Sequence, residues 1–174
     1  MGELMKTILI SVAAVAALAL AACSSHSAPA VAAGDTSAAR GAQLVALGGC
    51  NDCHTPRLPG GQPDMNRALS GFPEGGPLPP TVEGTDLIEI NGAFRGPWGL
   101  SLARNITSDK TNGIGSWTQQ EFLTTLRTGK DSSGHVLQPP MPWQGLAQVP
   151  DADLIAIYNY LMTVRPSTNK VTGP

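Results

Sequence analysis

Apolar residues recur at helical spacing in three stretches of the chain, which predicts three helices. The first helix is expected over residues 38–49, and it ends at two glycines that can stop a helix. The last is expected from about 150 to 164, with Pro150 at its first helical position and Pro166 beyond its end. Its apolar positions are Leu154, Ile157, Tyr158, Leu161 and Val164.

The middle helix has the clearest start signal. Thr118 and Glu121 have the Thr-x-x-Glu spacing of a capping box, and Trp117 and Phe122 occupy the positions of a hydrophobic staple. Gly129 suits the position just after the last helical residue. These signals predict an amphipathic helix that begins after Thr118.

The segments between these helices are expected to be mostly irregular. The chain contains 20 glycines and 15 prolines, and residues 55–80 are especially rich in both. Asn91-Gly92 favours a type I′ turn, so residues 86–90 and the segment from Ala93 onward predict a short β-hairpin.

The N-terminus has the pattern of a secretory signal peptide. Lys6 precedes an apolar stretch that ends at Ala22, shorter than the roughly 20 residues of a membrane span. Its end, Leu20-Ala21-Ala22-Cys23, resembles a bacterial lipoprotein box, which implies cleavage before Cys23 and lipidation of that residue. Plain secretion with cleavage near Ala22 is the alternative.

Three regions follow from these patterns. We expect a lipoprotein-type signal peptide at 1–22, a flexible tether rich in Ser, Ala, Gly and Pro at 23–37, and one domain at 38–174. The formal net charge of −2 gives no reason to expect binding to nucleic acid or to an anionic membrane.

The pentapeptide Cys50-Asn51-Asp52-Cys53-His54 has the spacing of a c-type haem attachment site. Two thiols at this spacing can add to the two vinyl groups of haem, and the following imidazole can bind the iron as the proximal ligand. Because attachment is covalent, a small chain can hold haem without a deep pocket.

Other interpretations of this Cys-x-x-Cys pair are half of a zinc site, a thioredoxin-like redox pair and an ordinary disulfide. A zinc site usually needs a second pair of ligands, but the remaining candidates, Cys23, His26 and His135, form no such pair. A redox pair is expected within a βαβ unit, and a disulfide leaves His54 without a role. Haem attachment is the interpretation that uses all three residues of the motif.

Met141 is the candidate for the sixth ligand of the iron. It lies in Pro139-Pro140-Met141-Pro142-Trp143, where the prolines exclude a regular helix, and its thioether suits haem iron. His135, in the same loop, is the competing ligand. Met65 and Met162 are weaker candidates, and a Met141 that only fills a gap in a loop is the alternative.

Seven segments of the chain match the sequence pattern of a known protein family. They lie at 48–56, 69–71, 96–99, 105–107, 111–118, 126–130 and 139–143. With them the chain resembles a bacterial class I-type monohaem cytochrome c, over most of residues 40–165. The resemblance implies an all-α cytochrome c fold of three to five helices around one covalent haem c, with long Pro/Gly-rich loops. It also implies haem attachment through Cys50 and Cys53, with His54 and Met141 as axial ligands.

The function implied is periplasmic transfer of one electron between a dehydrogenase or quinol oxidant and a downstream acceptor, which makes the chain an electron carrier and not an enzyme. The alternative is a haem-based peroxidase or gas sensor with an open distal site. We expect redox partner proteins and a lipid-anchored, periplasm-facing location, with the outer membrane favoured because Ser24 is not Asp.

The chain differs from the family pattern at two positions, and the roles of several other residues stay open. Phe72 stands where relatives often have His, and Pro150 stands where they often have a Ser N-cap. Gly41 is expected to let the first helix approach Tyr160, or alternatively Tyr158, on the last. Candidate partners of the haem propionates are Arg104, Asn105 and Arg127, and candidate walls of the haem pocket or core residues are Trp98, Trp117 and Trp143.

Overall fold

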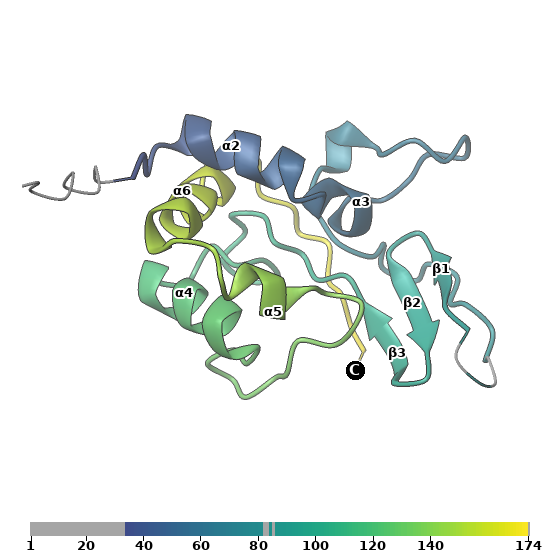
Figure 1. Cartoon of the computed structure of the whole chain (residues 1–174). Coiled ribbons are helices and arrows are strands. Elements are labelled where there is room, and N and C mark those ends of the chain that lie inside the picture. Colours follow the sequence, from purple (N-terminus) through teal and green to yellow (C-terminus); the bar gives the residue numbers. More distant parts are fainter. Residues whose placement is uncertain (1–33, 82–83, 85, 174) are drawn as a thin grey trace, which may run out of the picture. The chain divides into compact units, whose positions relative to one another are not determined.

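The computed structural model describes residues 34–81, 84 and 86–173. The expected signal peptide at 1–22, the lipidation site Cys23 and the tether as far as residue 33 lie outside these residues. Within the described ranges, no helix has the length and apolar character needed to cross a membrane. The elements in chain order are α2 (Ala38–Leu47), α3 (Cys50–His54), the 3-10 helix η1 (Met65–Arg67), β1 (Ile88–Ile90), β2 (Ala93–Gly96), β3 (Gly99–Leu102), α4 (Gln119–Thr128), α5 (Trp143–Leu146) and α6 (Asp151–Leu161) (Figure 1).

The three helices predicted from apolar spacing are confirmed as α2, α4 and α6. Both hydrogen bonds of the expected capping box join Thr118 and Glu121, and Gly129 ends α4 in the left-handed conformation with φ 70°. The predicted start of α6 is wrong by one residue. Pro150 has a non-helical ψ of 146°, and its carbonyl accepts from the N–H groups of Asp153 and Leu154, so it is the N-cap.

Helices α2 and α6 pack against each other through the predicted glycine. An ideal Cβ on Gly41 would lie 2.7 Å from Cβ of Tyr160, which confirms the expected close approach of these two residues. The guanidinium of Arg40 on α2 binds the carboxylate of Asp153 on α6 at 3.0 Å. The pair therefore combines a close backbone approach with an ion pair at its edge.

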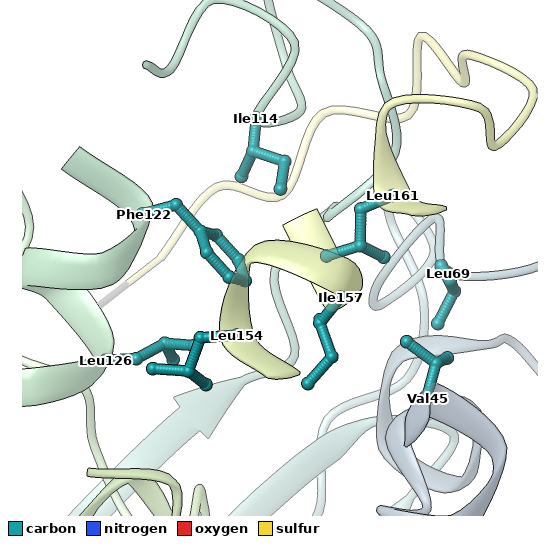
Figure 2. Packing of buried hydrophobic residues seen from close by; sticks show 8 residues of the cluster. All are labelled: Val45, Leu69, Ile114, Phe122, Leu126, Leu154, Ile157 and Leu161. Atoms are coloured by element: carbon teal, nitrogen blue, oxygen red, sulfur yellow. The ribbon is translucent and has the colours of Figure 1, made fainter. Parts of the chain in front are cut away.

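The main apolar core lies where α6 meets α2 and α4. Figure 2 shows the α6 side chains Leu154, Ile157 and Leu161 lying between Val45 of α2 and the α4 side chains. Its eight buried members are Val45, Leu69, Ile114, Phe122, Leu126, Leu154, Ile157 and Leu161. Full burial of each such side chain contributes about 1.5–3 kcal/mol, which makes this cluster the main apolar contribution of the helices.

The expected all-α class is incomplete, because the described residues also form a three-stranded antiparallel sheet in the order β1-β2-β3. The predicted hairpin is confirmed as β1 and β2: Asn91 and Gly92 have φ 52° and 87°, as a type I′ turn requires. Strand β3 was not predicted. It pairs with β2 through a turn at Pro97-Trp98, and its four residues are too few to give a periodic signal.

Candidate haem site

The predicted motif forms one short helix, α3, directly after α2. Gly49 stands between the two helices with φ 65°, a conformation that glycine adopts without strain. Cys50 and Cys53 are three residues apart and therefore share one face of α3. Both are free thiols and half-buried, so neither is used in a disulfide between them.

His54 ends this helix and is buried. Its Nδ1 lies 2.7 Å from the backbone carbonyl oxygen of Arg104. A carbonyl oxygen only accepts, so Nδ1 carries the proton and Nε2 keeps its lone pair. Burial lowers the pKa of His54 below its usual value, and the hydrogen bond to the Arg104 carbonyl opposes that shift. The imidazole is thus held neutral with Nε2 as the ring nitrogen able to bind a metal.

The backbone around His54 is held from two sides. Gly71 donates its N–H to the carbonyl of His54 at 2.7 Å, and Leu69 donates its N–H to the hydroxyl of Thr55 at 2.8 Å. On the other side, the β1–β2 turn approaches so closely that an ideal Cβ on Gly92 would lie 2.9 Å from the carbonyl oxygen of Cys53. The motif is therefore fixed by its surroundings and not only by its own helical turn.

The Asn91 side chain adds to this support. Its Oδ1 accepts from the N–H of Arg57 at 2.6 Å, three residues after the motif ends. The sequence predicts the Asn91-Gly92 turn, but no local pattern predicts that the turn packs on the Cys53 peptide. A backbone acceptor such as the Arg104 carbonyl has no signature in the sequence at all.

The alternatives to haem attachment are less well supported. Burial raises the pKa of Cys50 and of Cys53, with further contributions from the Asp52 charge, whereas a thioredoxin-like pair needs a thiol with a lowered pKa. Among the residues that the structure describes, the sheet is antiparallel and no βαβ unit surrounds the motif. Within the described part of the chain, no three His, Cys, Asp or Glu residues gather as a zinc site would require.

Met141 lies half-buried in the loop before α5. It packs against the main apolar core, as Cys50 also does, so both residues border the same cluster. The loop is tied to the sheet, because the hydroxyl of Ser101 on β3 donates to the carbonyl of Pro139 at 2.5 Å. Strand β3 therefore anchors the Met141 loop and leads directly into the segment that binds His54.

The competing ligands lie in different surroundings. His135 sits in a turn in which its N–H binds the Asp131 carboxylate at 2.9 Å and its carbonyl accepts from the Asp131 N–H. Met65 is 63% exposed on η1, whereas Met162 packs against the main core after α6. Of these side chains, only Met141 combines a place in the predicted loop with contact to the core that Cys50 borders.

The three candidate propionate partners have other bonds in this structure. Arg127 binds the carboxylate of Asp151 and the carbonyl of Ala147, and Asn105 donates to the carbonyls of Ser167 and Asn169. Arg104 donates to carbonyls near the C-terminus. Trp117 packs against the main core, Trp98 donates to the Ser101 hydroxyl at 3.3 Å, and Trp143 lies over Gly129.

The donor set fits a covalently attached haem. Two unpaired thiols and one neutral imidazole occur together on α3, which is the combination that such attachment requires. The hydroxyl of Ser70 is buried without a hydrogen-bond partner among the described residues, directly before Gly71. Unpaired buried hydroxyls are uncommon, so this one is consistent with a site that a bound group completes.

The chain is similar to curated cytochrome subunits. It is 32% identical over 130 residues to the gluconate 2-dehydrogenase cytochrome c subunit of Pantoea cypripedii. It is 39% identical over 75 residues to the fructose dehydrogenase cytochrome subunit of Gluconobacter japonicus, and 31% over 123 to the alcohol dehydrogenase (quinone) cytochrome c subunit of Gluconobacter oxydans. No family model matches the chain.

These relatives support a c-type cytochrome. The similarity covers 75%, 42% and 71% of this chain but only 24%, 15% and 20% of the three relatives. The chain therefore spans a quarter or less of the length of these proteins. Because these relatives are cytochrome c subunits, the similarity also implies that the bound group is haem c.

Proposed function

We propose that this chain is a monohaem c-type cytochrome that carries one electron between a dehydrogenase or quinol oxidant and a downstream acceptor. In this proposal Cys50 and Cys53 hold the haem through thioethers, and His54 and Met141 are its axial ligands. The sequence contains one Cys-x-x-Cys-His motif, which supports one haem. When bound, haem supplies an iron centre that changes its charge by one electron.

The observation that carries this proposal is the hydrogen bond from Nδ1 of His54 to the Arg104 carbonyl at 2.7 Å. It fixes the tautomer with a free Nε2 and sets the direction of the ring, which are the two requirements of a proximal ligand. Cys50 and Met141 both pack against the main apolar core, so the proposed haem would be bordered by apolar side chains. An apolar surrounding limits the access of other ligands and of solvent.

The electron partners are proposed from the relatives. Those proteins are described as cytochrome subunits of dehydrogenases, which favours a dehydrogenase as the electron donor of this chain. Ligation by both His54 and Met141 leaves no open position for a substrate. The chain is accordingly proposed as an electron carrier, within or beside an oxidoreductase complex, and the oxidation of the substrate belongs to its partner.

We further propose that the mature chain begins at Cys23 and is anchored by lipid to a membrane facing the periplasm, with the outer membrane favoured. Residues 1–22 would be the signal peptide and 23–37 the tether of the domain at 38–174. The support is the lipoprotein-type Leu20-Ala21-Ala22-Cys23 pattern. Several acyl chains, each stabilising by about 0.8 kcal/mol per buried CH₂, would hold the chain firmly. Mass spectrometry that finds an unmodified N-terminus beyond Cys23 contradicts this anchor.

Absorption spectra of the purified oxidised and reduced protein test the electron-carrier function. We expect c-type haem bands in both states and rapid reduction when the protein is mixed with a reduced dehydrogenase. Reduced protein should not bind carbon monoxide readily, because Met141 occupies the distal position. Immediate binding of carbon monoxide would instead indicate a peroxidase or gas sensor with an open site.

A further inference from the structure

Two loops far apart in sequence hold His54, and they also bind each other. In the first loop, residues 69–72, the N–H of Gly71 donates a hydrogen bond to the His54 carbonyl. In the second loop, residues 103–107, the carbonyl of Arg104 accepts a hydrogen bond from Nδ1 of His54. The N–H of Phe72 donates to the Ala103 carbonyl at 2.8 Å, and the N–H of Ile106 donates to the Leu69 carbonyl at 3.0 Å. We call these segments the two His54 loops.

The chain that follows α6 crosses both His54 loops. Residues 164–173, here called the C-terminal strap, leave α6 and extend toward β3, as the yellow segment in Figure 1 shows. Asn169 binds the first loop with its side-chain amide, donating to the carbonyls of Ser70 at 2.7 Å and Phe72 at 2.8 Å. Its Oδ1 accepts the N–H of Glu74 at 2.9 Å, so both donors and the acceptor are used.

The second loop is bound in the opposite direction, from loop side chains to strap carbonyls. Asn105 is buried and donates to the carbonyls of Ser167 at 2.7 Å and Asn169 at 3.0 Å. The guanidinium of Arg104 donates to the carbonyls of Val171 at 3.0 Å and Gly173 at 3.3 Å. The backbone carbonyl of Arg104 accepts the hydrogen bond from His54, and its side chain binds the strap. The strap therefore holds the residue that orients His54.

Apolar contacts fix the far end of the strap. Val171 packs against a second core cluster formed by Phe72, Ala93 and Leu102. An ideal Cβ on Gly173 would lie 2.7 Å from Cδ1 of Leu102, so the strap backbone lies directly on β3 there. The strap is thus attached at α6, at both His54 loops and at the sheet.

We propose that the C-terminal strap is a positioning device for the proximal ligand, with Asn169 and Asn105 as its positioning residues. The strap holds the two His54 loops in register, and the loops hold the Arg104 carbonyl on Nδ1 of His54. A hydrogen bond to the second ring nitrogen orients a ligating imidazole and raises its basicity. This proposal rests on the proposed haem ligation by His54.

Asn169→Ala in the haem-loaded protein tests it. The variant loses all three side-chain bonds, which weakens the bond from His54 to the Arg104 carbonyl. A less basic imidazole stabilises ferric iron less, so the midpoint potential should rise. We expect at least a threefold change in the redox equilibrium, about 28 mV at 59 mV per tenfold for one electron. The Nδ1 proton of His54 should also exchange with solvent about tenfold faster, since its protection depends on that bond.

Asn159→Ala is the matched control. Asn159 lies on α6 and donates to the Thr36 carbonyl at 2.8 Å, away from both His54 loops. The midpoint potential of the Asn159→Ala protein and the exchange rate of its His54 Nδ1 proton should equal those of the unaltered protein. Equal potentials and equal exchange rates in Asn169→Ala and Asn159→Ala would overturn the proposal, even if both variants lose stability.

Two further measurements apply if Asn169→Ala does not fold. Asn169→Ser adds no charge and keeps a small polar side chain, but it is too short to make both amide bonds to the Ser70 and Phe72 carbonyls, so it should raise the potential in the same direction. In the unaltered protein, the Asn169 side-chain amide and the backbone amides of Gly71, Phe72 and Ile106 should show similar protection from exchange, each relative to its own unprotected rate. Fast exchange of the Asn169 side-chain amide, with the Gly71, Phe72 and Ile106 amides still fully protected, would overturn the proposal. Unaltered protein that lacks haem would instead refute the proposed function.

Discussion

Gly41 of α2 and Ala156 of α6 approach so closely that no side chain fits between them. An ideal Cβ on Gly41 would lie 2.5 Å from the carbonyl carbon of Ala156 and 2.7 Å from Cβ of Tyr160. Both neighbours belong to the body of α6 and not to the end of a flexible side chain. The two helices therefore meet nearly backbone to backbone at this point.

Gly41→Ala should lower the free energy of unfolding by about 1–3 kcal/mol, because the added methyl group forces α2 and α6 apart. This is the net change: it already includes the gain of about 1 kcal/mol that alanine usually gives over glycine within a helix. Chemical denaturation followed by circular dichroism measures the difference. Gly145→Ala is the matched control, since Gly145 in α5 faces open space and its substitution should leave stability unchanged or raise it by up to about 1 kcal/mol. Equal losses in the two variants would contradict this explanation.

The elements best predicted from the sequence are those specified by their own residues. The start of α4 depends on Thr118 and Glu121, and the β1–β2 turn depends on Asn91 and Gly92, so a few adjacent positions suffice. The contact of Gly41 with Tyr160 was predicted from the resemblance to cytochromes c and not from periodicity. Strand β3 has no comparable signal, because it is four residues long and pairs with a strand of the same length.

The candidate site shows the same division. Cys50, Cys53 and His54 come together because they are neighbours in the chain, so spacing alone predicts them. The support of His54 comes from the Arg104 carbonyl, 50 positions away, and from Asn169, 99 positions beyond the Ser70 carbonyl that it binds. Such bonds use backbone groups that every residue has, and their partners cannot be recognised from residue type. They follow only from the tertiary fold.

Thr118→Ala should lower the free energy of unfolding by about 1 kcal/mol, because α4 loses its N-cap. The hydroxyl of Thr118 accepts the N–H of Glu121 at 3.2 Å, and alanine leaves that donor without a protein partner. Thermal unfolding of both proteins measures the effect. Thr124→Ala, an exposed position in the same helix, is the control and should be neutral or stabilising. A Thr118→Ala protein as stable as the original would show that the cap is dispensable.

The other half of the capping box predicts a dependence on pH. The N–H of Thr118, together with its hydroxyl, lowers the pKa of Glu121 below the ordinary value of 4.5. A lowered carboxyl pKa contributes stability above pH 4.5 that is lost as the pH falls through the folded-state pKa. The stability difference between the original protein and Glu121→Gln should therefore shrink below pH 4.5. Glu74→Gln, in an exposed loop, serves as the control, and a difference for Glu121→Gln that stays constant with pH would contradict the linkage.

Replacement of the two motif thiols tests the attachment of haem. Cys50→Ser and Cys53→Ser should each leave one thioether and give unstable, incompletely matured protein. The double variant should contain no covalent haem and little folded protein, because haem is expected to fill part of the core. Haem staining after denaturing electrophoresis and circular dichroism measure both properties. Cys23→Ser removes a thiol outside the motif and should keep the haem, whereas a double variant with a normal fold would show that haem is not part of the core.

Met141→Ala tests the sixth ligand, on which the proposed function depends. Met141 lies between two prolines, and its side chain borders the same apolar core as Cys50. A thioether stabilises ferrous iron, so its loss should lower the reduction potential. The weak sulfur-to-iron band at the red end of the oxidised spectrum should disappear, and reduced protein should now bind carbon monoxide. Met65→Ala, which changes an exposed methionine, should alter none of these properties. If Met141→Ala keeps the original spectrum while His135→Ala changes it, the ligand is His135, and the potential of the carrier must be explained by two histidines.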